Sequence, residues 1–128
     1  MKYEVQINNE IEIIFCNLEG DLDIEESISL SKSLREKATE LGFNVFYDAQ
    51  KLCKPTNIMS VYEFSTQLSS ILDIPAHRNI KVAFLYKPGY FDDYWEFYEN
   101  VAVNRGLLIK VFVKKEEAIK WLQAADKD

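Results

Sequence analysis

The sequence predicts an α/β domain built on a mixed, mostly parallel five-stranded sheet with about four helices, in the order β-β-α-β-α-β-α-β-α. Short β-branched and aromatic runs alternate with longer segments whose apolar residues recur every three or four positions. Strands that alternate with helices favour parallel pairing through right-handed crossovers. At 128 residues, without a repeat or a linker, the chain is expected to form a single domain over residues 1–128.

The first segment has the pattern of a β-hairpin. Val5 and Ile7 alternate with polar residues, and the Asn-Asn-Glu sequence at 8–10 offers turn chemistry. The apolar run 11–16 follows directly. We therefore expect the first two strands to form the one antiparallel pair of the sheet.

A long first helix follows. Asp23 and Glu26 have the spacing of a capping box, and Gly42 is a fitting C-terminal stop. Between them lies an apolar stripe of near-helical period, made of Ile24, Ile28, Leu34, Ala38 and Leu41.

The rest of the chain continues the alternation. A short aromatic strand, 43–47, is expected to end at Asp48, and the nearly continuous apolar run 81–86 is typical of a strand buried on both faces. The other expected elements are a second helix closed by Pro75, a third helix at about 91–106, a strand at 107–113 and a closing helix at 116–122.

Charge and hydropathy exclude two classes of partner. The chain has 21 acidic and 15 basic residues, a net charge of −6, and its cations are scattered. An acidic surface repels phosphate backbones, so we expect no nucleic-acid partner. No apolar run approaches the ~20 residues of a transmembrane helix and no signal peptide is visible, so we expect no membrane span and a cytoplasmic location.

No familiar catalytic or cofactor motif is present. The four glycines spell no phosphate-binding loop, and no serine elbow or zinc motif occurs. His77 stands alone and is expected to be a surface or capping residue. Cys16 lies in an apolar run and is expected to be buried, whereas Cys53 is expected to be accessible. We therefore expect no enzyme, no metal and no cofactor.

The third helix is unusually aromatic. Its aromatic side chains fall on one arc, which also includes Phe97, and acidic residues such as Glu96 and Glu99 occupy the opposite side. One interpretation is a large core face. The other is a ligand pocket or a dimer contact, in which Tyr and Trp are favoured. The residues concerned are Tyr90, Phe91, Tyr94, Trp95 and Tyr98.

The opening hairpin, the strand ending at Asp48 and the E-x-A-x-x-W-L segment at 116–122 together resemble the STAS-like family, above all its small stand-alone bacterial members. Anti-sigma factor antagonists share this fold. The resemblance implies protein contacts at the start of the second helix, where antagonists carry a phosphorylated serine. The corresponding residues here are Asp48, Thr56, Asn57 and Ser60. Asn57 cannot accept phosphate, and a helix cap is the favoured role for Thr56 or Asn57.

Three functional hypotheses follow. The leading one is a non-enzymatic binding or regulatory module that acts through protein–protein contacts, with a protein partner or a second copy in a homodimer. The alternative is a carrier of an apolar small ligand or lipid beside the third helix, since the wider fold group includes CRAL-TRIO-related carriers. The third is a receiver-like phosphoryl acceptor, with Lys87 and the acidic residues Glu19, Asp21, Asp23 and Asp48 at strand ends.

Overall fold

The computed structural model describes residues 1–53, 69, 73–89 and 92–124, apart from the side chain of Ile24. Its sheet has five strands in the same order as the chain, β1-β2-β3-β4-β5. β1 runs antiparallel to β2, and every other neighbouring pair is parallel, which confirms the predicted mixed sheet. The strands are β1 (Lys2–Asn8), β2 (Ile13–Asp21), β3 (Asn44–Cys53), β4 (Val82–Leu85) and β5 (Ile109–Phe112).

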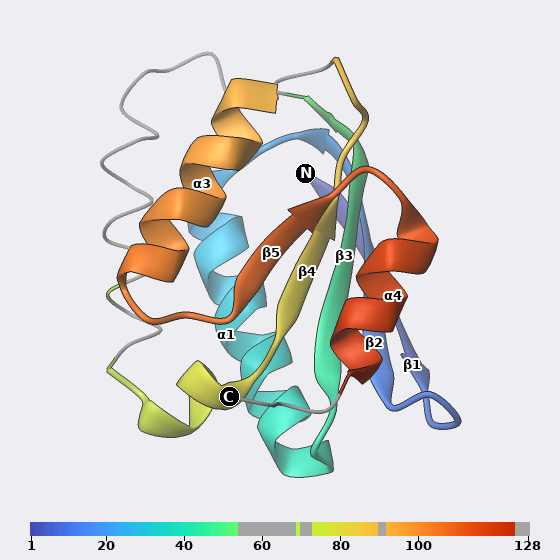
Figure 1. The fold of residues 1–128 in the computed structure, drawn as a ribbon, viewed down its shortest axis with the longest axis vertical. Coiled ribbons are helices and arrows are strands. Elements are labelled where there is room, and N and C mark those ends of the chain that lie inside the picture. The colour runs from blue at the N-terminus through green and yellow to red at the C-terminus, as the bar shows by residue number, and fades with distance from the viewer. Residues whose placement is uncertain (54–68, 70–72, 90–91, 125–128) are drawn as a thin grey trace.

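Within the described residues, the helices are α1 (Ile24–Leu41), α3 (Asp92–Asn104), α4 (Lys115–Gln123) and the short 3-10 helix η1 (Pro75–Asn79). Most of the predicted second helix lies outside the described residues. Pro75, which was expected to close that helix, is the first residue of η1. Figure 1 shows α1 and α3 on one side of the sheet and α4 on the other.

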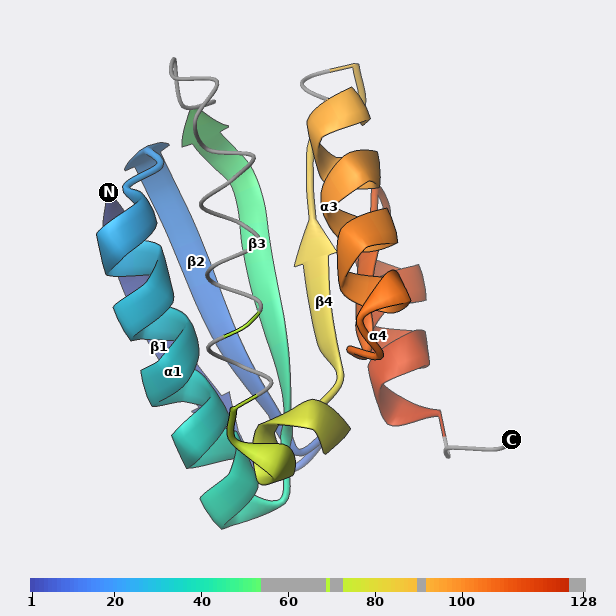
Figure 2. The same ribbon diagram turned by 90° about the vertical axis from the view of Figure 1, so that its left-hand side faces the viewer.

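The strand order explains this distribution of helices. Each parallel connection steps in the same direction across the sheet, and right-handed crossovers in one direction all pass over the same face. Figure 2 shows both α1 and α3 over that face, at opposite sides of it, with β2, β3 and β4 visible between them. The opposite face has α4, the last helix of the chain, as its cover among the described helices.

Alternation along the strands divides the core into two layers. Ile14, Cys16 and Leu18 of β2 point to the α1–α3 side and join the larger buried cluster. Ile13 and Phe46 point the other way, into a smaller cluster beneath Ala118 and Leu122 of α4. The two-residue period thus assigns the buried residues of β2 before its bulge, and those of β4, to one layer or the other.

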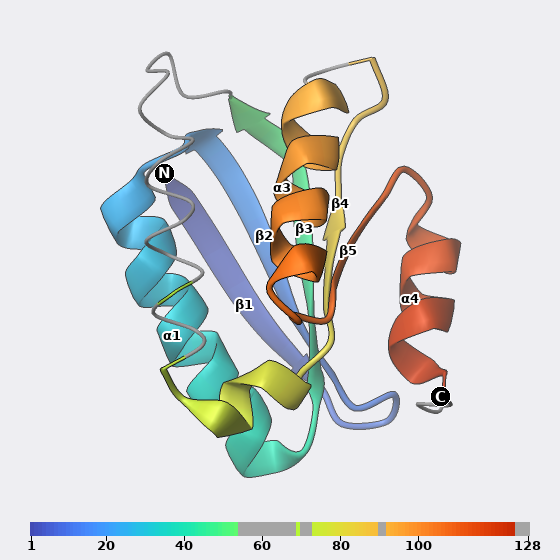
Figure 3. The same ribbon diagram turned by 60° about the vertical axis from the view of Figure 1, so that its left-hand side comes forward.

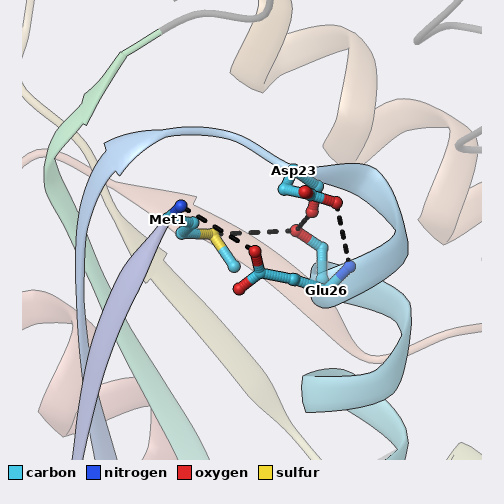
Figure 4. Close-up of polar contacts among 4 residues, drawn as sticks. Met1, Asp23 and Glu26 are labelled. Atoms are coloured by element: carbon cyan, nitrogen blue, oxygen red, sulfur yellow. Dashed lines mark hydrogen bonds and ion pairs between the residues drawn. The ribbon is translucent and has the colours of Figure 1, made fainter.

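Both predicted ends of α1 are confirmed. The Asp23 carboxylate accepts the backbone N–H of Glu26 at 3.1 Å, and Gly42 takes a left-handed conformation with φ 74°. The Glu26 carboxylate does not complete the capping box but lies 4.0 Å from the amino group of Met1 (Figure 4). Only glycine adopts the left-handed C-cap without a steric cost, which explains why the helix stops there.

Three expectations about single residues are wrong. Asp48 lies inside β3, because the strand continues to Cys53 with Leu52 buried and paired to β2. Phe97, predicted on the apolar arc of α3, is 45% exposed. His77 is buried rather than a surface residue, because η1 folds back against α1.

No helix among the described residues is long and apolar enough to cross a membrane.

Candidate functional site

A mostly apolar pocket of about 50 Å³ opens on the α1–α3 side of the sheet. Three of the five aromatic residues predicted for a ligand site, Tyr94, Trp95 and Tyr98, line it. Tyr90 and Phe91 lie outside the described residues. Its other lining residues come from the chain start, β2, α1, β3 and β4: Met1, Leu18, Leu22, Ser27, Leu30, Ser31, Arg35, Tyr47, Leu52, Val82 and Phe84.

Aromatic rings form one wall of this pocket. Trp95 has its ring centre 5.4 Å from that of Phe84 and meets Tyr94 edge-on, also at 5.4 Å. Tyr47 stacks on Phe84 at 4.8 Å. Since Trp95 and Tyr98 are buried, the two interpretations of the aromatic helix are not exclusive. The same rings are both core and pocket wall.

The pocket also contains a buried cation, Arg35, which is 2% exposed. Its Nη1 donates to the backbone oxygen of His77 at 2.7 Å, and its Nε has no hydrogen-bond partner among the described residues. Burial lowers the pKa of Arg35, while the nearby phenols of Tyr47 and Tyr98 act in the opposite direction. The guanidinium therefore has a buried donor, Nε, that is left to bind something else.

Sequence reasoning missed Arg35, although a signal was present. Arg35 stands seven residues after Ile28 and three before Ala38, on the apolar stripe of α1. A basic residue in the buried phase of an amphipathic helix is unusual, because arginine is seldom fully buried without a partner.

A second depression, of about 450 Å³, is polar and includes Asp48. The Asp48 carboxylate accepts the backbone N–H of Gln50 at 3.1 Å. Thr56, Asn57 and Ser60 lie outside the described residues, so of the four contact residues implied by the resemblance only Asp48 is placed. Its lining mixes both charge signs: Lys2, Tyr3, Glu4, Asn17, Leu18, Glu19, Asp48, Gln50 and Lys51.

Two acidic residues of the receiver-like hypothesis have structural positions that differ from those it requires. Asp23 caps α1, and Asp48 lies inside β3 rather than at its end. No group of three or more His, Cys, Asp or Glu side chains that could hold a metal ion occurs in the described part of the chain. The geometry therefore gives this hypothesis no support.

The two edges of the sheet differ. All seven residues of β1 are exposed, and no described residue pairs with its outer edge (Figure 3). Tyr3, Val5 and Ile7 project on the α1 side, because they stand opposite Leu18, Cys16 and Ile14. β5 is only four residues long, and the Glu99 side chain accepts a hydrogen bond from one of its backbone amides.

No family model matches the chain, and no curated protein matches it significantly. Several solved structures are similar, and two of them are as follows. One is an uncharacterised DUF3478-family protein from Shewanella loihica, described as having a SpoIIAA-like fold; it shares 15% identity with a TM-score of 0.56, over 94% of this chain and 92% of the other. The second is the anti-sigma factor antagonist SpoIIAA in its unphosphorylated form, with 13% identity and a TM-score of 0.48, over 97% of this chain and 100% of the other.

At such identities a structural likeness shows the fold alone. The first of these structures superposes over nearly the whole of both chains with a TM-score of 0.56 and is described as having a SpoIIAA-like fold. This chain therefore has the SpoIIAA-like fold, which is the STAS-like fold that the sequence pattern predicted.

Proposed function

We propose that this protein is a non-enzymatic binding module that acts through protein contacts, with β1 as its contact strand and a second copy of the chain as its first partner. The observation that supports the proposal is the open edge of β1. A seven-residue strand with every side chain exposed presents unpaired backbone groups to another strand. The edge strand β5 is less available for such pairing, because the Glu99 carboxylate already accepts a hydrogen bond from the backbone amide of Val111.

The side chains of β1 are complementary to a second copy. Two antiparallel copies related by a two-fold axis at Val5 would pair all seven residues. In this register Tyr3 stands opposite Ile7 of the second copy, so the apolar side chains, which are 53% and 41% exposed here, meet on one face. Glu4 stands opposite Gln6, and Lys2 opposite Asn8, so no like charges are directly opposed.

The register also provides a polar contact. Within one chain, the Gln6 side-chain amide lies 3.4 Å from the Glu4 carboxylate. In the paired register the same two residue types face each other twice, once on each side of the axis. A register centred on Glu4 would instead oppose two carboxylates, which disfavours it.

Analytical ultracentrifugation of charge variants at Val5 tests this proposal. Val5→Lys and Val5→Glu each place like charges on the two-fold axis, so each protein alone should be monomeric. Their mixture should recover the dimer, because Lys then opposes Glu. Val103→Lys, at a valine on α3 that is 56% exposed, is the matched control and should dimerise like the unaltered chain. A monomeric unaltered chain, or a dimer that tolerates both single variants, contradicts the proposal.

A separate protein partner would then meet the surface implied by the family resemblance, around Asp48 with Thr56, Asn57 and Ser60. The polar depression beside Asp48 supports such a contact, because it leaves charged groups of both signs exposed. Lipid carriage has less support. An apolar cavity that binds benzene measures about 150 Å³, whereas the pocket beside α3 measures about 50 Å³.

A further inference from the structure

We infer that the pocket beside α3 binds a short-chain organic carboxylate, with the carboxylate on Arg35 and the apolar end against the aromatic wall. This inference is independent of the β1 contact, which lies at the edge of the sheet. It goes beyond the apolar site that the sequence suggested beside the third helix, because its central residue is a buried cation, Arg35.

The first step is the electrostatic state of Arg35. An arginine is always protonated at ordinary pH, and taking its charge out of water costs several kcal/mol unless a partner compensates. In the described part of the chain, no carboxylate forms an ion pair with Arg35. One carbonyl, that of His77, accepts from Nη1 at 2.7 Å. The cation is therefore only partly compensated.

The second step is the position of the unpaired Nε donor of Arg35. Arg35 lines the pocket together with Ser31, Tyr47 and Tyr98. Its Nε has no hydrogen-bond partner among the described residues. A planar guanidinium matches the two oxygens of a carboxylate, which gives shorter and stronger hydrogen bonds than a neutral acceptor does.

The third step is the size and polarity of the remaining space. A water molecule needs about 10–15 Å³ of such volume, so a pocket of about 50 Å³ holds a group of only a few non-hydrogen atoms. Leu18, Leu30 and Trp95 supply an apolar lining. An apolar pocket with a few convergent polar groups selects a ligand that has one charged end and one apolar end. Propionate has these properties.

Tryptophan fluorescence provides a direct assay. The chain has two tryptophans, and Trp121 packs on the opposite face of the sheet. In a Trp121→Phe background, Trp95 is therefore the single reporter, and it lies in the pocket wall. Propionate should produce a saturable change in Trp95 emission in the millimolar range. Propionamide, which has the same shape without the charge, should bind at least about tenfold more weakly. Chloride at the same ionic strength should give no saturable change.

Variants at Arg35 locate the site. Arg35→Met should weaken propionate binding at least about tenfold, and Arg35→Lys should retain part of it. Lys32→Met, which removes one positive charge from an exposed position three residues earlier on α1, is the matched control and should bind normally. Equal binding of propionamide, an equal response to chloride, or no saturable response overturns the inference. The propionate, propionamide and chloride titrations use a chain that retains Arg35, so they test the inference even if Arg35→Met fails to fold.

Discussion

The carboxylate of Glu99 accepts the backbone N–H of Val111 at 2.7 Å, so that a side chain of α3 occupies the outer edge of β5. The amide points away from β4, since β4 bonds to the alternate residues Leu108 and Phe112. Natural sheets protect their edges with charged side chains and short strands. Glu99 thus does two things: it ties α3 to the sheet and closes an edge that would otherwise pair with another chain.

Glu99→Ala should lower the free energy of unfolding by about 1.5–3 kcal/mol, because a hydrogen bond to a charged acceptor is lost and an amide is left unsatisfied. Urea denaturation measures this loss. Glu99→Gln keeps an acceptor oxygen and should cost less. Glu96→Ala, at an exposed position of the same helix, should change the free energy by under about 0.5 kcal/mol. Equal losses at positions 96 and 99 would show that the contact to Val111 does not matter.

Lys81→Met should destabilise the docking of α4 on the sheet by about 1–3 kcal/mol. The buried Lys81 ammonium donates to the backbone oxygens of Trp121 at 3.1 Å and Ala124 at 2.8 Å, at the C-terminal end of α4. The Trp121 oxygen also accepts the backbone N–H of Ala124 at 3.3 Å. Urea denaturation and amide hydrogen exchange in α4 check this. Lys110→Met, at an exposed position of β5, is the control. Unchanged exchange in α4 would contradict the role assigned to Lys81.

The two thiols should react very differently with an alkylating reagent. Cys53 is exposed, whereas Cys16 is fully buried and burial raises the pKa of its thiol to about 12. The thiolate is the reactive form, so native Cys16 should react about a thousandfold or more slowly than Cys53. Mass spectrometry of alkylated peptides measures the ratio. Denaturant should bring the two rates together. Rapid native labelling of Cys16 would mean that β2 is not packed as described.

Stability should fall at alkaline pH. Burial raises the pKa values of the Cys16 thiol and the Tyr98 phenol to about 12. In the unfolded chain these groups lose their protons near pH ~8.5 and ~10. Between those values and pH 12 the unfolded state binds fewer protons than the native state, so unfolding becomes easier as pH rises. Urea midpoints measured from pH ~8 to pH ~11 test this. Cys16→Val should show a shallower decline, and a flat profile for the unaltered chain would refute the linkage.

Local features were predictable from the sequence. The alternation of Ile14, Cys16 and Leu18 assigns one face of β2, and the ends of α1 at Asp23 and Gly42 follow from capping chemistry that involves only neighbouring residues. Each of these signals is complete within a few positions of the chain. The number and type of strands followed from them.

Non-local features were not predictable. The polar run from Asp48 to Lys51 was interpreted as a connection, yet it is strand because β2 pairs with it, for example at Glu19 and Lys51. The acceptor role of Glu99 depends on β5, and that of the His77 carbonyl on Arg35, which is 42 positions earlier in the chain. Such contacts depend on tertiary packing, which overrides the local preferences of the residues.

The order of the strands has a consequence for how the chain acquires its structure. Each strand after the first pairs with the strand that precedes it in the chain. During synthesis, the neighbour of each new strand has therefore already left the ribosome. The hairpin of β1 and β2 is a local pairing, whereas each parallel pair must wait for its crossover segment to be made, which slows folding. The core layer beneath α4 is an exception to this early burial. Ile13 and Phe46 stay exposed until α4 is made, and α4 is translated after the last strand. During synthesis, that uncovered layer is where a chaperone would bind.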